Sequence, residues 1–156
     1  MKEQLIKVII NGLHGKNTHI QPKKAIDGLN PENARKKPDD SNHSCWELLH
    51  HIVIWQEVIF EAIEGKEVDW QEVSKNHNWP SDEYISNDSN YPNLVDKFLQ
   101  GLSKAEELVN SADLHKPMPA WSDAPVIQAF MVLLQHNSYH LGQIITTRKN
   151  LGLWNP

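Results

Sequence analysis

Four segments of the chain repeat their apolar residues with the 3.6-residue period of an α-helix, and no segment alternates with the period of two that marks a strand. The four segments are residues 2–13, 44–64, 91–110 and 123–149. The third of them is the clearest, because apolar residues line one face and charged residues cover the other. We therefore predict an all-α fold with no strands, and one further short turn at Asn30-Pro31.

The ends of these segments carry local stop and start signals. The second segment opens with Ser44-x-x-Glu47, a capping-box pattern, and stops before Gly65. The fourth follows Ser122 and has Pro125 in its first turn. These signals predict the helix boundaries independently of the apolar periodicity.

Four long helices predict a four-helix bundle, in a single domain over residues 1–156. The first and second helices, and the second and third, are joined by long connections, residues 14–43 and 66–90. The loop-like connection 66–90 is long enough to run back along the whole second helix, which makes the third helix parallel to the second. The shorter link 111–122 suits an antiparallel pair. The predicted topology is up-down-down-up, with the second and fourth helices antiparallel.

Composition argues against two classes of partner. The formal net charge is −5 and the basic residues are scattered, so no basic stripe indicates a nucleic acid partner. No apolar run approaches the roughly 20 residues of a membrane span, and the N-terminus does not look like a signal peptide. The single cysteine, Cys45, excludes an internal disulfide and fits a reducing compartment. We expect a soluble cytoplasmic protein that binds neither nucleic acid nor membrane.

Three of the nine histidines are predicted to face the same part of the core. His136 and His140 stand four residues apart and share the face of the fourth helix that carries Gln143. His51 projects into the apolar face of the second helix, whereas His50 lies about 100° away, toward its edge or solvent. If the second and fourth helices are antiparallel, His51 lies at a height similar to that of His136 and His140.

Burying three imidazoles from two helices costs free energy unless their polar nitrogens are satisfied by a shared interaction. We therefore predict that His51, His136 and His140 bind one divalent metal ion per chain, although ordinary buried, hydrogen-bonded histidines are the alternative reading. Three histidines without a fourth protein ligand are typical of an open, catalytic metal site. Imidazole suits Zn, Ni, Fe or Cu, and the sequence does not choose among them.

Two polar residues near the predicted ligands are candidates for supporting roles. Glu47 and Gln143 each lie about one turn from a predicted ligand and are candidates for orienting a ligand ring or a bound water; for Glu47, capping with Ser44 is the alternative. Trp55 and Tyr139 are expected to form wall and core. No acid, base or nucleophile is assigned, because no serine has an evident base beside it and Cys45 projects away from the His51 face.

Two other metal-site patterns are incomplete. Glu47-x-x-His50 matches half of a ferritin-like di-iron site, but the chain has no second Glu-x-x-His. A hemerythrin-like set would need His43, which precedes the cap of the second helix. Neither pattern supplies the remaining ligands in order.

The chain resembles the DinB-like (YfiT-like) metalloenzyme family along nearly its whole length. "HSCWELLHHIVIWQE" (43–57) is similar to the segment that carries the family's first metal histidine, and "QHNSYHLGQI" (135–144) to the segment with the other two. "GLNPENARKKP" (28–38) and the terminal "LGLWNP" are also similar. The resemblance implies an up-down-down-up bundle, frequent dimers and a divalent metal on His51, His136 and His140. One departure is Thr18-His19-Ile20, where relatives often have Trp-His-Gly.

Relatives with assigned activity include thiol S-transferases that use bacillithiol and a mycothiol-dependent maleylpyruvate isomerase. The resemblance therefore implies a metal-dependent enzyme that acts on a small molecule, with thiol S-transfer as the first hypothesis. The alternatives are a metal-dependent hydrolase, a non-enzymatic metal-binding bundle and a structural scaffold.

The fourth helix carries a second apolar stripe opposite the histidines. This stripe consists of Ile127, Phe130, Met131, Leu134, Leu141 and Ile145. A helix that is apolar on nearly every side is buried on more than one side. The stripe predicts a two-fold homodimer, with packing against the first and third helices of the same chain as the alternative.

Overall fold

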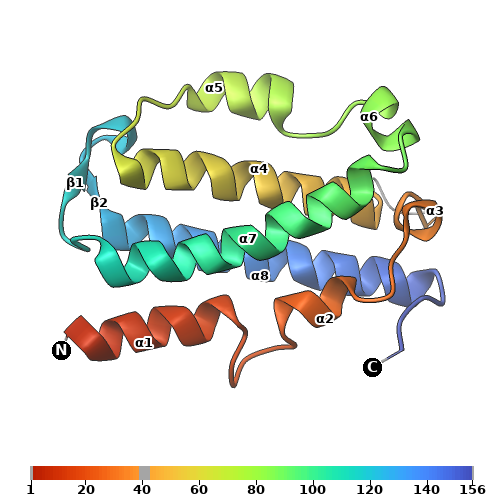
Figure 1. Cartoon of the computed structure of the whole chain (residues 1–156), viewed down its shortest axis with the longest axis horizontal. Helices are drawn as coiled ribbons and strands as arrows, with labels where there is room; N and C mark the ends of the chain where they lie inside the picture. The colour runs from red at the N-terminus through yellow and green to blue at the C-terminus, as the bar shows by residue number, and fades with distance from the viewer. Residues whose placement is uncertain (1, 39–42, 156) are drawn as a thin grey trace.

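The computed structural model describes residues 2–38 and 43–155, and most of this part of the chain is helical (Figure 1). The all-α prediction is confirmed. Each of the four predicted long segments contains one long helix: α1 Lys2–Leu13, α4 Cys45–Glu64, α7 Asn90–Ser111 and α8 Val126–Asn150. Ser44 caps α4 through the predicted capping box, and Gly65 ends it in a left-handed conformation.

Short helices occupy the two long connections. The first connection contains α2 (Pro22–Ile26) and α3 (Pro31–Ala34), and α3 confirms the turn predicted at Asn30-Pro31. The second contains α5 (Trp70–Glu72), a π-helical turn (Val73–His77) and α6 (Asp82–Ser86). The prediction that 66–90 is loop-like was therefore wrong. The side chains of Asp69 and Ser81 cap α5 and α6, which explains how such short helices begin.

A small hairpin corrects the prediction that the chain has no strands. β1 (Pro117–Met118) pairs antiparallel with β2 (Ala124–Pro125) around the 3-10 turn Pro119–Trp121. Ser122 and Asp123 have φ angles of 50° and 59°, a left-handed conformation that an α-helix does not accept. For this reason α8 begins at Val126 and not at residue 123.

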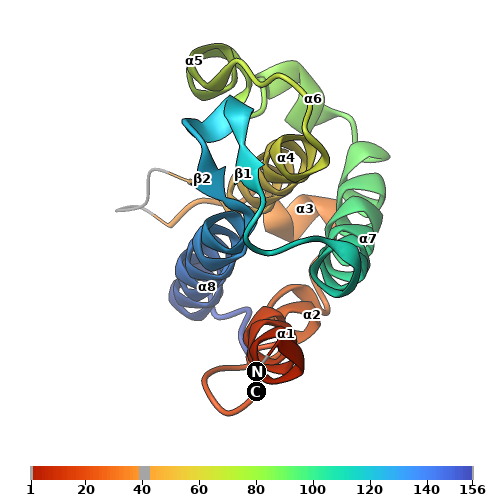
Figure 2. The same ribbon diagram turned by 90° about the vertical axis from the view of Figure 1, so that its left-hand side faces the viewer.

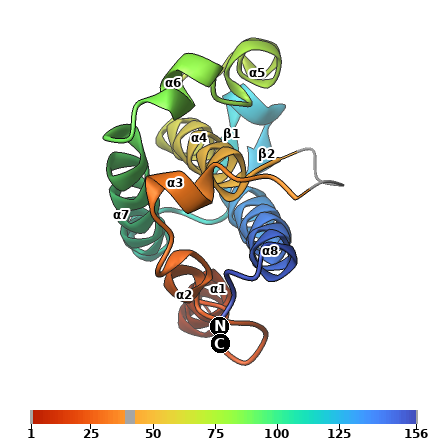
Figure 3. The same cartoon turned by 90° about the vertical axis from the view of Figure 1, so that its right-hand side faces the viewer.

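The four long helices lie side by side, with α7 and α8 between α4 and α1 (Figure 2). Helix α4 packs against α7 and α8, and α1 packs against the same two helices. In Figure 1 the chain runs in one direction along α1 and α8 and in the other along α4 and α7. The end-on views show α5 and α6 on the side of α4 that faces away from α1 (Figures 2 and 3). The connection 66–90 therefore covers the side of α4 that α7 and α8 leave open.

A buried arginine ties the C-terminal end of α8 to α2. Arg148 is only 6% exposed, and among the residues that the structure describes its guanidinium donates hydrogen bonds to backbone carbonyls and not to a carboxylate. Nη1 donates to the backbone oxygen of Ala25 at 2.7 Å. Nη2 donates to the backbone oxygen of Asp27 at 2.8 Å and to that of Leu153 at 3.0 Å. Arg148 thus supplies donors to carbonyls at the C-terminal end of α2 and in the tail that follows α8.

The second apolar stripe of α8 is used within the chain. Phe130 and Leu141 are buried, and the other four stripe residues are half-buried against the two apolar core clusters. Packing inside one chain, the alternative to a dimer interface, accounts for these contacts. The homodimer stays a prediction. Within the described ranges, none of the helices is both long enough and apolar enough to cross a membrane.

Candidate metal centre

The three predicted histidines meet between α4 and α8. One ring nitrogen from each of His51, His136 and His140 lies within 4.8 Å of the other two. The ring centroids are 4.9 Å apart for His51 and His136, 4.3 Å for His51 and His140, and 4.4 Å for His136 and His140. His51 is 7% exposed, and the other two rings are half-buried. The close packing of α4 on α8 thus brings one histidine of α4 against two from α8.

Two of the rings have their Nδ1 atoms occupied by oxygen acceptors. His51 Nδ1 donates to the backbone oxygen of Asn78 at 3.2 Å, and His140 Nδ1 donates to Gln143 Oε1 at 2.6 Å. Because these oxygens can only accept, each Nδ1 carries the proton and each Nε2 keeps a lone pair. Hydrogen bonds of this kind fix the tautomer of metal-binding histidines.

The third ring completes a set that fits a metal ion. His136 Nε2 lies 3.0 Å from His51 Nε2. Two nitrogens bound to one tetrahedral ion at about 2.0–2.1 Å would lie roughly 3.4 Å apart, so little movement is needed. The other nitrogen of this ring, His136 Nδ1, is buried and has no hydrogen-bond partner among the described residues. The donor set suits a divalent ion such as Zn, Ni or Fe.

Burial keeps the three imidazoles neutral. Burial, together with the smaller effect of the neighbouring His140 ring, lowers the pKa of His51 to about 4 and that of His136 to about 3. Burial also lowers the pKa of His140, although the hydrogen bond that this ring donates to Gln143 acts in the opposite direction. Only the neutral ring has a lone pair for a metal, so the site is prepared to bind an ion at neutral pH.

These pKa shifts predict acid sensitivity of the metal-free protein. The folded pKa values lie below the unfolded value of about 6.5, so the unfolded chain binds more protons between roughly pH 6.5 and 4. The free energy of unfolding is therefore expected to fall by roughly 5 kcal/mol as the pH drops from 7 to 4.5, with about half of the change from each of His51 and His136. Urea unfolding of chelator-treated protein across this range measures the change.

One variant distinguishes the contribution of the histidines to this loss of stability from that of the carboxylates that titrate below pH 5. His136→Gln removes one imidazole whose pKa is strongly lowered. This variant is expected to lose less stability than the wild-type protein over the same pH interval. Equal losses in the two proteins would contradict the assignment of acid sensitivity to the buried ring.

The two residues predicted to support the site, Gln143 and Glu47, differ in what they contact. Gln143 contacts His140, as described above. Glu47 uses Oε2 to accept from the Ser44 backbone N–H at 2.7 Å and Oε1 to pair with Lys37 at 2.8 Å. Of the two roles predicted for Glu47, these contacts support the cap, because one oxygen accepts from Ser44 and the other pairs with Lys37.

The aromatic neighbours differ from the expectation in one respect. Trp55 is half-buried, and its ring lies edge-on to both His51 and His136 at 6.3 Å, so it forms a wall as predicted. Tyr139 is 65% exposed and is not a core residue. Cys45 is buried, and burial raises the pKa of its thiol to about 12, so it does not act as a nucleophile at neutral pH.

A histidine and a serine that the sequence did not connect are hydrogen-bonded. His19 Nδ1 donates to the Ile20 oxygen at 2.8 Å, so its Nε2 accepts from Ser138 Oγ at 2.9 Å. Ser138 lies two residues from each of His136 and His140, which places it on the opposite side of α8. We assign this pair the role of docking the chain after α1 onto α8.

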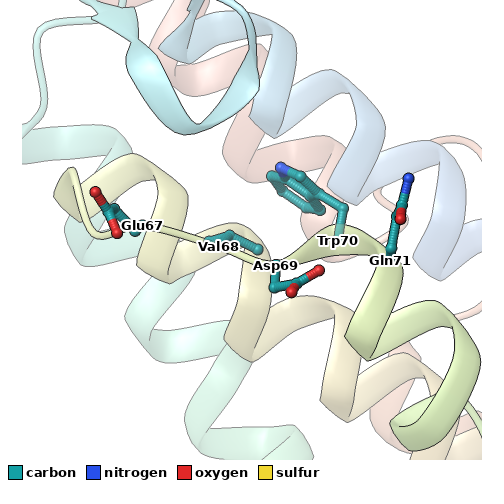
Figure 4. Close-up of a pocket in the computed structure, with 5 residues that line it drawn as sticks. All are labelled: Glu67, Val68, Asp69, Trp70 and Gln71. Carbon is teal, nitrogen blue, oxygen red and sulfur yellow. The ribbon is translucent and has the colours of Figure 1, made fainter.

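A surface pocket near α5 is separate from the three histidines. Its volume is about 550 Å³ and it is lined by Glu67, Val68, Asp69, Trp70 and Gln71. In Figure 4 the indole of Trp70 and the carboxylates of Glu67 and Asp69 point in different directions and do not converge on one ligand position. The indole instead donates to the Ala120 oxygen at 2.6 Å, so its role is to hold α5 against the hairpin region.

Comparison with known proteins gives one match. A family model described as the DinB superfamily matches residues 23–144, which include the three histidines and Gln143. Searches of curated proteins and of solved structures gave no significant match.

Proposed function

This chain belongs to the DinB superfamily, and from that premise we propose that it is a metal-dependent enzyme that transfers a small-molecule thiol. The observation that carries the proposal is the convergence of His51, His136 and His140 within 4.8 Å. The group includes no other histidine, cysteine or carboxylate from the described residues. An ion held there would keep a coordination position for a substrate or water. We take the fold to be the up-down-down-up bundle, which the directions of the four long helices in Figure 1 support.

The residues around the site have different roles: some would bind the ion, and others orient the ligand rings or shield them. His51, His136 and His140 would hold the ion, and Gln143 and Asn78 fix the rings of His140 and His51. Trp55 shields one side of the centre. A divalent ion held by neutral imidazoles would lower the pKa of a thiol or water bound to it, which makes either a better nucleophile near neutral pH.

The thiol is proposed to come from the substrate and not from the chain. Cys45 is 1% exposed, its Sγ lies 3.8 Å from the Ile144 oxygen, and burial holds its proton in place. A low-molecular-weight thiol is the first choice because the thiol S-transferases that the sequence resembles use one. A hydrolase would use the same site with water in place of the thiol.

Cobalt substitution tests the choice between thiol and water. With Co²⁺ in the site, bacillithiol or cysteine is expected to produce a sulfur-to-metal charge-transfer band, and His136→Ala is expected to abolish both the band and any transferase turnover. An unchanged spectrum together with turnover of an ester or amide panel would favour the hydrolase. If a fully loaded protein shows neither, the non-enzymatic metal-binding bundle becomes the better account.

We further propose that the protein acts in the cytoplasm as a homodimer. The single cysteine fits a reducing compartment, and two-fold dimers are the commonest oligomers. Light scattering at tens of micromolar is expected to give twice the chain mass of 17.9 kDa. A monomeric mass at that concentration would contradict the dimer without affecting the metal site.

A further inference from the structure

The side of His51 that faces away from the other two histidines is covered by the connection between α4 and α7. After the π-helical turn Val73–His77 the chain reaches Asn78 and Trp79. The backbone oxygen of Asn78 accepts from His51 Nδ1 at 3.2 Å, and its side-chain Oδ1 accepts from Trp55 Nε1 at 2.8 Å. His51 and Trp55 are one helical turn apart on α4, so Asn78 bridges two neighbouring positions of the same face.

Trp79 holds the flat face of the same imidazole. Its indole stacks on His51 with ring centroids 4.5 Å apart and an interplanar angle of 13°. The His51 ring is therefore constrained by a hydrogen bond at Nδ1, by an indole on one face, and by the Trp55 ring edge-on at 6.3 Å. A rotation of the ring about its bond to Cβ would break the hydrogen bond and disturb the stack.

We propose that Asn78 and Trp79 are positioning residues that fix the orientation and the tautomer of His51, so that its Nε2 lone pair faces His136. The role of this orientation in metal binding rests on the proposed function, whereas the orientation itself does not. The bond from Trp55 to the Asn78 side chain anchors the segment to α4, and the anchored backbone carbonyl then selects the Nδ1-protonated tautomer. The Asn78 side chain thus acts on His51 indirectly, by holding the Asn78 backbone oxygen in the position that accepts from His51 Nδ1.

The anchor predicts how Asn78 variants behave. Asn78→Ala removes the acceptor for Trp55, whereas Asn78→Asp keeps an oxygen at the same position. Partners that orient a metal-binding histidine typically change metal affinity by about 10–100-fold when they are removed. We expect at least about a tenfold loss of Zn²⁺ or Co²⁺ affinity in Asn78→Ala and recovery of most of it in Asn78→Asp. Asn76→Ala is the matched control, because Asn76 bonds to Glu72 on the exposed side of the same turn.

Trp55→Phe removes the donor of the hydrogen bond between Trp55 and Asn78, and so tests that bond from its other side. It removes the indole N–H but keeps an aromatic ring beside His51. If the two residues act through one hydrogen bond, Trp55→Phe and Asn78→Ala should each weaken metal binding, and the double variant should be little worse than either single variant. Additive losses in this cycle would contradict the proposed anchor.

The decisive measurement uses the metal-free protein. Nitrogen-15 NMR of the histidine rings is expected to show His51 as the Nδ1-protonated tautomer in the wild-type protein, Asn76→Ala and Asn78→Asp. Asn78→Ala and Trp79→Leu are expected to show a mixture of tautomers while keeping native circular dichroism. An unchanged tautomer in both variants would overturn the proposal. If the tautomers behave as expected but the wild-type protein binds no divalent metal, the positioning of His51 stands and the proposed function fails.

Discussion

Replacing His51 or His140 with alanine is expected to remove most of the bound metal, from about one divalent ion per chain to less than about a tenth. Each substitution deletes a proposed ligand, and this loss should exceed the roughly 10–100-fold effect of removing a partner that only orients a ligand. Metal analysis after dialysis against a metal buffer measures the content. Circular dichroism checks that each variant is folded.

His50 is the matched control for this experiment. It is the next residue on α4, but its ring lies against Tyr84, with centroids 5.3 Å apart, and does not belong to the three-histidine group. His50→Ala should therefore keep its metal. Loss of the metal in His50→Ala with retention in His51→Ala would show that the histidines are wrongly assigned. A chelator should also lower the melting temperature of the wild-type protein, since a ligand that binds only the folded state stabilises it.

Replacing Arg148 with methionine is expected to lower the free energy of unfolding by at least about 4.5 kcal/mol. The change leaves the carbonyls of Ala25, Asp27 and Leu153 without their charged donor, and hydrogen bonds to charged groups contribute roughly 1.5–3 kcal/mol each. Arg148→Lys should recover less than half of the loss, because a single ammonium cannot reproduce the guanidinium fork. Urea unfolding measures both variants.

Lys149→Met controls for the removal of a positive charge from the last turn of α8. Lys149 is exposed, and its loss should cost no more than about 1 kcal/mol. Hydrogen exchange in Arg148→Met should also show faster exchange in α2 and in the tail after α8. An Arg148→Met variant within 1 kcal/mol of the wild-type protein, or equal to Lys149→Met, would show that the arginine does not hold these segments together.

The sequence alone determined features that depend on neighbours along the chain. Ser44 and Glu47 cap α4 as predicted because a capping box needs only residues three apart. The inward direction of His51 and of the pair on α8 followed from helical periodicity, which is a local property of each segment. The convergence of three histidines from two helices was therefore open to prediction once the two helices were taken as antiparallel.

Other features were decided only when distant segments came together. Asn78 lies 27 residues from His51, His19 lies 119 residues from Ser138, and Arg148 lies 123 residues from Ala25. No periodicity or spacing links such residues, because each hydrogen bond joins a side chain to a residue on a different element. The β1–β2 hairpin and the short helices in 66–90 were missed for a related reason. These elements are too short to show a pattern, and they are stable because they pack on the long helices.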